Sequence, residues 1–184
     1  MFFSIGLARP QIGAKLKEHQ SKGAEVMIAL DVSNSMLAQD YSPDRLQRAK
    51  LAISRLVDKL NGDRIGLVLF AGTSFVQLPI TTDYVSAKMF LGNISTESVP
   101  VQGTAIGDAI NTCIKSFSAQ SENSRAIIVI TDGENHEDNP VEAAKTAASM
   151  GISVYTIGVG SAQGQPIPMK GGRLKDSQGN IVVT

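Results

Sequence analysis

Short runs in which every residue is apolar recur along this chain, and they restrict its fold more than any other feature. Residues 26–30 (VMIAL) and 126–130 (AIIVI) are two such runs, each as long as a strand. A strand without polar positions is typical of the middle of a parallel sheet, where both faces are covered. Apolar residues recur at helical spacing in the segments 43–60, 82–91, 106–117 and 140–150. This alternation predicts an α/β domain with a doubly wound, mostly parallel sheet and helices on both faces.

One pair of strands is expected to break the parallel pattern. Residues 65–70 and 75–80 are further apolar runs, and only the four residues AGTS join them. So short a link favours a hairpin, which predicts one antiparallel strand at the edge of the sheet. Just before the first expected helix, Ser42 is expected to cap the helix and Pro43 to occupy its first position.

The chain divides into three expected segments. A lead-in covers 1–23, a single domain covers 24–160, and a Gly-rich segment with an expected hairpin near residues 177–180 covers 161–184. The lead-in begins MFFSIGLARP, an apolar start that is shorter than the ~20 residues of a membrane span. It is interpreted either as an end without fixed structure or as the end of a membrane helix.

Composition excludes several classes of protein. Seventeen Lys and Arg residues balance seventeen Asp and Glu residues, so the chain has no net positive charge with which to hold nucleic acid. The single cysteine, Cys113, excludes an internal disulfide and a Cys-based zinc site. It lies on the apolar face of an expected helix, which favours a core position.

Two of the apolar strands end in an aspartate. Asp31 follows the first strand directly, and Asp132 follows Thr131 after a later one. If the two strands are parallel neighbours, both carboxylates lie at the same edge of the sheet, where α/β proteins bind ligands. Ser33 and Ser35 add hydroxyl oxygens two and four residues after Asp31. Such an all-oxygen set suits Mg²⁺ and not zinc; the alternative is an aspartate and two serines that only cap a helix and bridge a loop.

The string DVSNS after a buried strand resembles the metal-ion-dependent adhesion site of von Willebrand factor A domains. In that family a threonine before a helix and an aspartate after the fourth strand complete the site, and Thr104 in QGTAIGDAI and Asp132 in IVITDGEN match them. The resemblance implies a Rossmann-like fold that binds Mg²⁺, with Ca²⁺ or Mn²⁺ as alternatives. It implies that Ser33, Ser35 and, in one state, Thr104 bind the metal directly, and that the two aspartates act largely through waters. A partner protein then supplies a carboxylate, so the chain is expected to be an interaction module and not an enzyme.

Longer strings, among them FAGTSFVQLPITTDY, resemble the bacterial aerotolerance (Bat) proteins. This resemblance implies a membrane-anchored parent protein whose domain faces the periplasm at the inner membrane. Von Willebrand factor A domains normally end with a further helix and strand, whereas the segment after residue 160 has no helical period. The chain is therefore expected to be truncated at its C-terminal side, with the strand at 152–159 left partly uncovered.

Two other functions stay open. One is Mg²⁺-dependent phosphoryl transfer of the haloacid-dehalogenase type, which also places an aspartate after its first strand but needs a second acid where Ser33 stands. The other is a structural domain without metal. Asp108 and His136 are interpreted as an early-helix acid and an exposed loop residue. Four acidic residues form either solvated helix-start charges or a field that recruits cations: Glu134, Glu137, Asp138 and Glu142.

Overall fold

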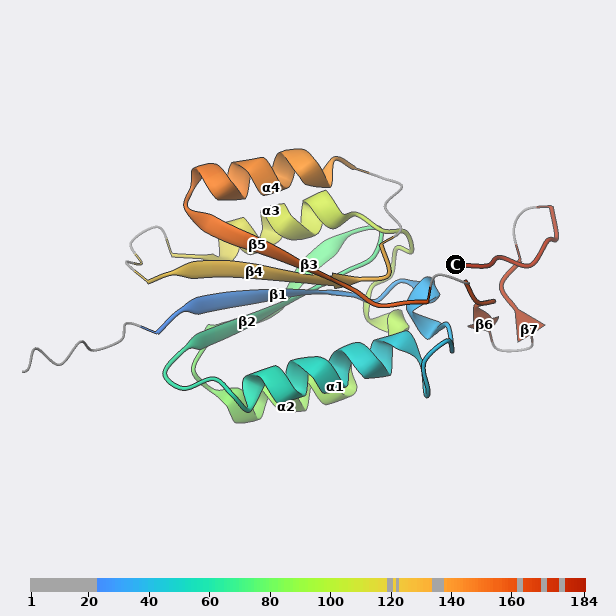
Figure 1. Cartoon of the computed structure of the whole chain (residues 1–184), viewed down its shortest axis with the longest axis horizontal. Helices are drawn as coiled ribbons and strands as arrows, with labels where there is room; N and C mark the ends of the chain where they lie inside the picture. Colours follow the sequence, from blue (N-terminus) through green and yellow to red (C-terminus); the bar gives the residue numbers. More distant parts are fainter. Residues whose placement is uncertain are drawn as a thin grey trace, which may run out of the picture.

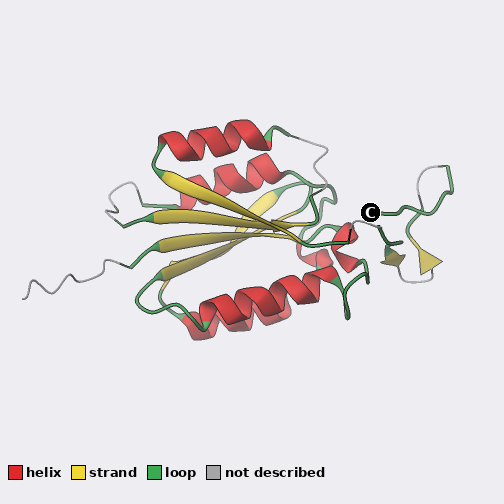
Figure 2. Cartoon of the chain, in the orientation of Figure 1, coloured by secondary structure: helices red, strands yellow, loops and turns green. Residues whose placement is uncertain are grey.

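The structure is a computed structural model that describes residues 23–118, 121, 123–133, 138–161, 164–169, 172–175 and 178–184. Within these residues a five-stranded sheet lies between two layers of helices (Figures 1 and 2). The strands of this sheet are β1 (Glu25–Asp31), β2 (Arg64–Phe70), β3 (Ser74–Thr81), β4 (Arg125–Thr131) and β5 (Ile152–Gly158). The helices are α1 (Arg45–Val57), α2 (Tyr84–Asn93), α3 (Ile106–Ser116) and α4 (Pro140–Ser149), with the short 3₁₀ turns η1 (Asn34–Leu37) and η2 (Thr96–Ser98).

The order of the strands is β3-β2-β1-β4-β5, with β1 in the centre. β1 pairs in parallel with β2 on one side and β4 on the other, and β5 continues in parallel from β4. β3 alone is antiparallel, against β2. The doubly wound sheet with one antiparallel edge strand is thereby confirmed. Because the chain winds outward from β1 in both directions, the carboxyl ends of β1 and β4 form the switch point where such folds bind ligands.

Side chains of β1 alternate between two separate cores. Ile28 and Leu30 pack with α1 and α2, whereas Met27 and Ala29 pack with α3 and α4. All four side chains are fully buried. Figure 1 shows the two helical layers on opposite faces of the sheet. The continuous apolar run of β1 thus follows from burial on both faces.

The first helix begins later than expected. Asp44, not Ser42, caps α1: its backbone is extended, with φ −161°, and its carboxylate accepts a hydrogen bond from Gln47 N at 2.7 Å. The prediction of Ser42 as the cap is therefore wrong. A carboxylate is the stronger acceptor at the positive end of a helix, and Asp44 stands next to the first helical residue, Arg45.

β5 is the edge strand of the sheet on the side opposite β3. Tyr155 and Ile157 on this strand are 59% and 46% exposed, and no helix follows β5 in the part of the chain that the structure describes. A two-stranded sheet of β6 (Pro168–Met169) and β7 (Gly172–Arg173) follows instead, which the sequence did not predict. A bridge between Lys175 and Ile181 flanks the expected hairpin near residues 177–180. None of the described helices has the length and apolar character needed to cross a membrane.

Candidate metal centre at the carboxyl edge of the sheet

Asp31 is the last residue of β1 and lies in the interior, with no exposed surface. Both of its carboxylate oxygens accept hydrogen bonds: Oδ1 from Ser33 N at 2.9 Å, and Oδ2 from Thr131 Oγ1 at 2.6 Å. Burial raises the pKa of Asp31 to about 6, although these hydrogen bonds favour the charged form. At neutral pH the carboxylate is thus charged, and no cationic side chain among the described residues compensates it.

Ser33 and Ser35 bring two hydroxyl oxygens together beside this carboxylate. Their Oγ atoms lie 2.9 Å apart, and both residues are buried. The turn η1 holds them, since Met36 N donates to the carbonyl of Ser33 and Ala38 N to that of Ser35. Adjacent oxygen ligands on an octahedral Mg²⁺ ion also lie about 3 Å apart, since each metal–oxygen bond is about 2.1 Å.

Thr104 lies on the loop before α3 and is buried, with 5% of its surface exposed. The loop is held against the end of β2, where Ala105 N donates to the carbonyl of Ala71 at 2.7 Å. Two residues before Thr104, Gln102 Oε1 accepts a hydrogen bond from Asn34 N at 3.0 Å. Thr104 is therefore on a loop that contacts the serine loop directly. Its role as a metal ligand stays a prediction.

The close approach of these loops depends on a glycine. A side chain at Gly72 would place its Cβ 2.5 Å from the carbonyl oxygen of Gln102. That separation is shorter than any real contact of a Cβ atom, so only glycine lets the loop after β2 lie against the loop of Thr104.

Asp132 follows β4, the parallel neighbour of β1, and its side chain is 1% exposed. Its Oδ2 accepts a hydrogen bond from Arg45 Nη1 at 2.8 Å. Among the described residues, Oδ1 has no hydrogen-bond partner although it is buried. A buried carboxylate oxygen without a donor is costly unless a cation, or a water bound to one, approaches it.

Sequence reasoning missed three residues of this site: Thr131, Arg45 and Asp40. Arg45 pairs with both Asp132 and Asp40, and the hydrogen bond from its guanidinium holds the pKa of Asp40 below its usual value. The sequence held one signal for Arg45. A cation at the first position of a helix is unfavourable beside the positive end of the helix dipole, so its presence indicates a compensating contact elsewhere.

The donor set fits a hard divalent cation. Its atoms are hydroxyl and carboxylate oxygens, and one of them is the buried oxygen of Asp132 that lacks a donor. In the described parts of the chain, no group of three or more His, Cys, Asp or Glu side chains is placed to hold a metal. The site therefore offers few anionic ligands, unlike a cage of carboxylates or a zinc centre.

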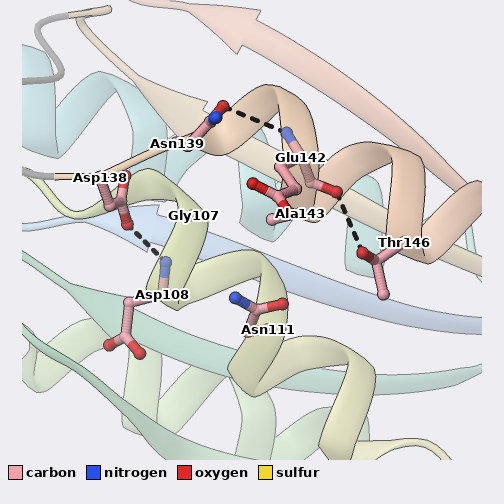
Figure 3. Close-up of a pocket in the computed structure, with 8 residues that line it drawn as sticks. All are labelled: Gly107, Asp108, Asn111, Asp138, Asn139, Glu142, Ala143 and Thr146. Atoms are coloured by element: carbon pink, nitrogen blue, oxygen red, sulfur yellow. Dashed lines mark hydrogen bonds between the residues drawn. The ribbon is translucent and has the colours of Figure 1, made fainter.

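A groove between α3 and α4, of about 380 Å³, has Asp108, Asp138 and Glu142 among its lining residues (Figure 3). Asp138 Oδ2 accepts a hydrogen bond from Asp108 N at 2.7 Å, and Asn139 Oδ1 accepts one from Glu142 N at 3.2 Å. These side chains thus satisfy the starts of two helices. The carboxylate of Asp108 accepts hydrogen bonds from Ser74 N and Oγ, at the start of β3. Glu134, His136 and Glu137 lie outside the described residues.

Comparison with known proteins gives one consistent family. The model of the von Willebrand factor type A domain matches residues 25–170. An uncharacterized protein of Borreliella burgdorferi is 31% identical over 166 residues, which are 89% of this chain and 48% of that protein. A UPF0353 protein of Mycolicibacterium gilvum is 28% identical over 94% of this chain and 57% of its own length. The chain thus spans about half the length of these curated relatives.

Two solved structures are more similar in sequence. The conserved hypothetical protein BatB of Bacteroides thetaiotaomicron is 58% identical, with a TM-score of 0.85 over 88% of this chain and 80% of that one. An aerotolerance-related membrane protein of Bacteroides fragilis is 56% identical, with a TM-score of 0.85 over 88% of this chain and 81% of that one. Because the family model covers most of the chain and the sheet has the expected topology, the chain belongs to the von Willebrand factor type A domain family.

Proposed function

We propose that this domain is a metal-dependent protein–protein interaction module that binds Mg²⁺ at its carboxyl edge, with Ca²⁺ or Mn²⁺ as alternative ions. The family consists of protein-interaction modules, some of which carry a metal-ion-dependent adhesion site. One observation carries the proposal for this chain: among the described residues, the buried Asp31 has no cation partner, and it lies one strand from a buried oxygen of Asp132 that has no donor there.

Each residue of the site has a proposed role. The hydroxyls of Ser33, Ser35 and Thr104 bind the ion directly, and the carboxylates of Asp31 and Asp132 hold its waters. Neutral hydroxyls remove little of the positive charge of the ion, so a bound Mg²⁺ supplies a strong Lewis-acidic contact for one further oxygen. A carboxylate of a partner protein is the ligand that fits best, because charge-assisted contacts exceed neutral ones in strength.

The proposal is one of binding without catalysis. A phosphatase of the haloacid-dehalogenase type needs an acid–base group two residues after its first aspartate. That position is Ser33, whose hydroxyl pairs with Ser35 Oγ. No feature of the described site therefore favours phosphoryl transfer.

We further propose that the parent protein is anchored in the bacterial inner membrane with this domain on the periplasmic side. The similar protein of B. fragilis is described as an aerotolerance-related membrane protein. The chain enters the sheet at Glu25, the amino end of β1, and the metal site lies at the opposite end (Figure 1). An anchor that precedes β1 would thus leave the metal face directed away from the membrane, open to a partner.

Titration of the metal-free domain with Mg²⁺ in a calorimeter tests this function. We expect saturable binding of one ion by the wild type, and none by Asp31→Ala, with the circular dichroism of both proteins alike. Asp58→Ala is the control, because Asp58 is an exposed carboxylate after the far end of α1. A wild type that binds no divalent ion would contradict the proposal.

The partner contact is tested with two peptides of otherwise identical sequence, one with a Glu and the other with a Gln at the same position. We expect the Glu peptide alone to bind, only with Mg²⁺ present, and not after a chelator is added. Equal binding of both peptides, or binding that the chelator leaves unchanged, would exclude the carboxylate as the metal-bound group.

A further inference from the structure

Arg45 is the largest fully buried side chain of the described chain, with 2% of its surface exposed. It begins α1, next to the metal centre, and its guanidinium contacts two buried carboxylates. The core between α1 and the sheet is formed by apolar side chains such as Leu46 and Ile53, whereas Arg45 contacts carboxylates. The arginine is therefore explained by the site that it touches.

The guanidinium divides its donors between two acids. Nε donates to Asp40 Oδ1 and Nη2 donates to Asp40 Oδ2, each at 3.0 Å. Nη1 donates to Asp132 Oδ2 at 2.8 Å. Asp40 thus holds one side of the planar fork in a bidentate pair, and this pair sets the direction of the remaining donor.

We propose that Arg45 is a positioning residue for the metal centre, which holds one oxygen of Asp132 so that the other faces the ion and its waters. The proposal rests on the proposed metal binding. Partners behind a metal ligand commonly determine its orientation and contribute strongly to the affinity for the metal. Here the partner engages Oδ2 and leaves Oδ1, the buried oxygen without a donor, for that role.

The segment after β5 holds the arginine in place from the other side. Ser161 N donates to Asp40 Oδ2 at 2.6 Å, and the carbonyl of Thr184 accepts from Arg45 Nη2 at 3.0 Å. Gly160 lies flat against the guanidinium, since a Cβ there would be 3.3 Å from Cζ. These contacts surround the guanidinium and leave Arg45 little freedom to turn away from Asp132.

Replacement of Arg45 by lysine distinguishes a positioning role from an effect of charge alone. Arg45→Lys keeps the positive charge, but an ammonium cannot bind one carboxylate with two parallel hydrogen bonds and direct a third donor to another. If charge alone mattered, the affinity for a cation would be unchanged. If orientation matters, the affinity falls although the net charge is the same.

The experiment titrates the metal-free domain with Mn²⁺ alone and follows the electron paramagnetic resonance signal of the free and bound ion. We expect the Arg45→Lys variant to bind Mn²⁺ about tenfold more weakly than the wild type, with a broadened signal from the bound ion. Arg64→Lys is the matched control, because Arg64 pairs with the buried Glu25 at the opposite end of the sheet. It should bind Mn²⁺ as the wild type does.

A second variant, Asp40→Glu, decides the question if Arg45→Lys does not fold. It keeps Arg45, Asp132 and the net charge but changes the geometry of the bidentate pair that orients the guanidinium, and we expect affinity for Mn²⁺ about threefold below that of the wild type, a smaller loss than is usual for a direct partner of a metal ligand. Unchanged affinity in the folded variants, or an equal loss in Arg64→Lys, would overturn the positioning role. A wild type that binds no Mn²⁺ would instead overturn the proposed function itself.

Discussion

Asp31 and Asp132 lie at the ends of adjacent parallel strands, yet the two carboxylates have different partners. In the described part of the chain, the partners of Asp31 are neutral: Ser33 and the hydroxyl of Thr131. Asp132 has a buried arginine, shared with Asp40, that offsets part of its charge. The same residue type at the ends of neighbouring strands therefore has an unfavourable charge in one case and a partly compensated charge in the other.

This difference changes how the metal-free site should be understood. Two neighbouring carboxylates would be expected to repel each other, and removal of one would relieve that repulsion. Burial of Asp31 is the main cause of its raised pKa, however, and the charge of Asp132 is the smallest of the causes. Arg45 is shared between Asp40 and Asp132, so the three carboxylates of the site face one guanidinium, and the described contacts of that guanidinium go to Asp40 and Asp132 but not to Asp31.

The largest expected effect is a dependence of stability on pH. The pKa of Asp31 is about 6 in the folded protein against 3.8 in its ordinary state, so the folded protein binds this proton more tightly. The contribution of Asp31 to stability without metal is then greatest below about pH 4 and falls as pH rises to about 6, by about 3 kcal/mol in total. Urea unfolding of the wild type and Asp31→Asn in a chelator, across this pH range, measures the difference between them.

The two curves should diverge as pH rises, with Asp31→Asn the more stable at neutral pH, because the amide carries no charge. Saturating Mg²⁺ should remove most of the divergence by stabilising the charged carboxylate. Curves that run parallel across the range would show that Asp31 is compensated as Asp132 is, and the contrast between them would be lost.

The second prediction compares the two carboxylates directly as metal sites. Asp31→Asn should weaken Mg²⁺ binding by about a hundredfold, just under 3 kcal/mol, whereas Asp132→Asn should weaken it by about tenfold. The reason is that Arg45 already neutralises much of the charge that Asp132 offers to an ion. Calorimetric titration of both variants measures the ratio, and equal losses would contradict the unequal compensation.

A smaller effect is expected from the hydrogen bond that Thr131 donates to Asp31 at 2.6 Å. Thr131→Val keeps the shape of the side chain but leaves a buried carboxylate oxygen without its donor, which should cost about 1–3 kcal/mol of stability. Thermal unfolding in a chelator measures this loss. Thr146→Val is the control, because its hydroxyl only bonds a carbonyl within an exposed turn of α4. A loss of the same size in both variants would assign it to the helix and strand propensities of valine.

How much of this site could be predicted from the sequence depends on how far apart along the chain its interacting residues lie. Asp31, Ser33 and Ser35 stand on one loop after one apolar strand, so a local pattern was enough to single them out. The adjacency of β1 and β4, which brings Asp132 to the same edge, followed from the fully apolar strands and the rules of parallel sheets.

Arg45 could not be predicted in this way. Its partner Asp132 lies 87 residues further along the chain, and no local pattern pairs the two. The sequence instead favoured a helix start at Ser42 and Pro43, which drew attention away from the residue that begins α1. The role of Arg45 therefore depends on a tertiary contact, whereas burial of β1 on both faces could be predicted from its continuous apolar run.

The smallest effect is expected where a unit charge is removed far from the metal centre. Lys88 pairs with Asp58, and their side chains are 38% and 60% exposed. Asp58 follows the last residue of α1, a helix of 13 residues that begins at Arg45, so the pair lies about 20 Å from the guanidinium along the helix. Lys88→Met should change stability by less than about 1 kcal/mol, as is usual for exposed ion pairs.

The same variant also tests whether charge acts locally on the ion. The pair lies about two Debye lengths from Arg45 at physiological ionic strength, so Mg²⁺ affinity should stay within about twofold of that of the wild type. Calorimetry at low and at physiological salt measures this. If Lys88→Met altered Mg²⁺ affinity as much as Asp132→Asn does, the field of the whole protein would govern metal binding, and the different surroundings of Asp31 and Asp132 would not matter.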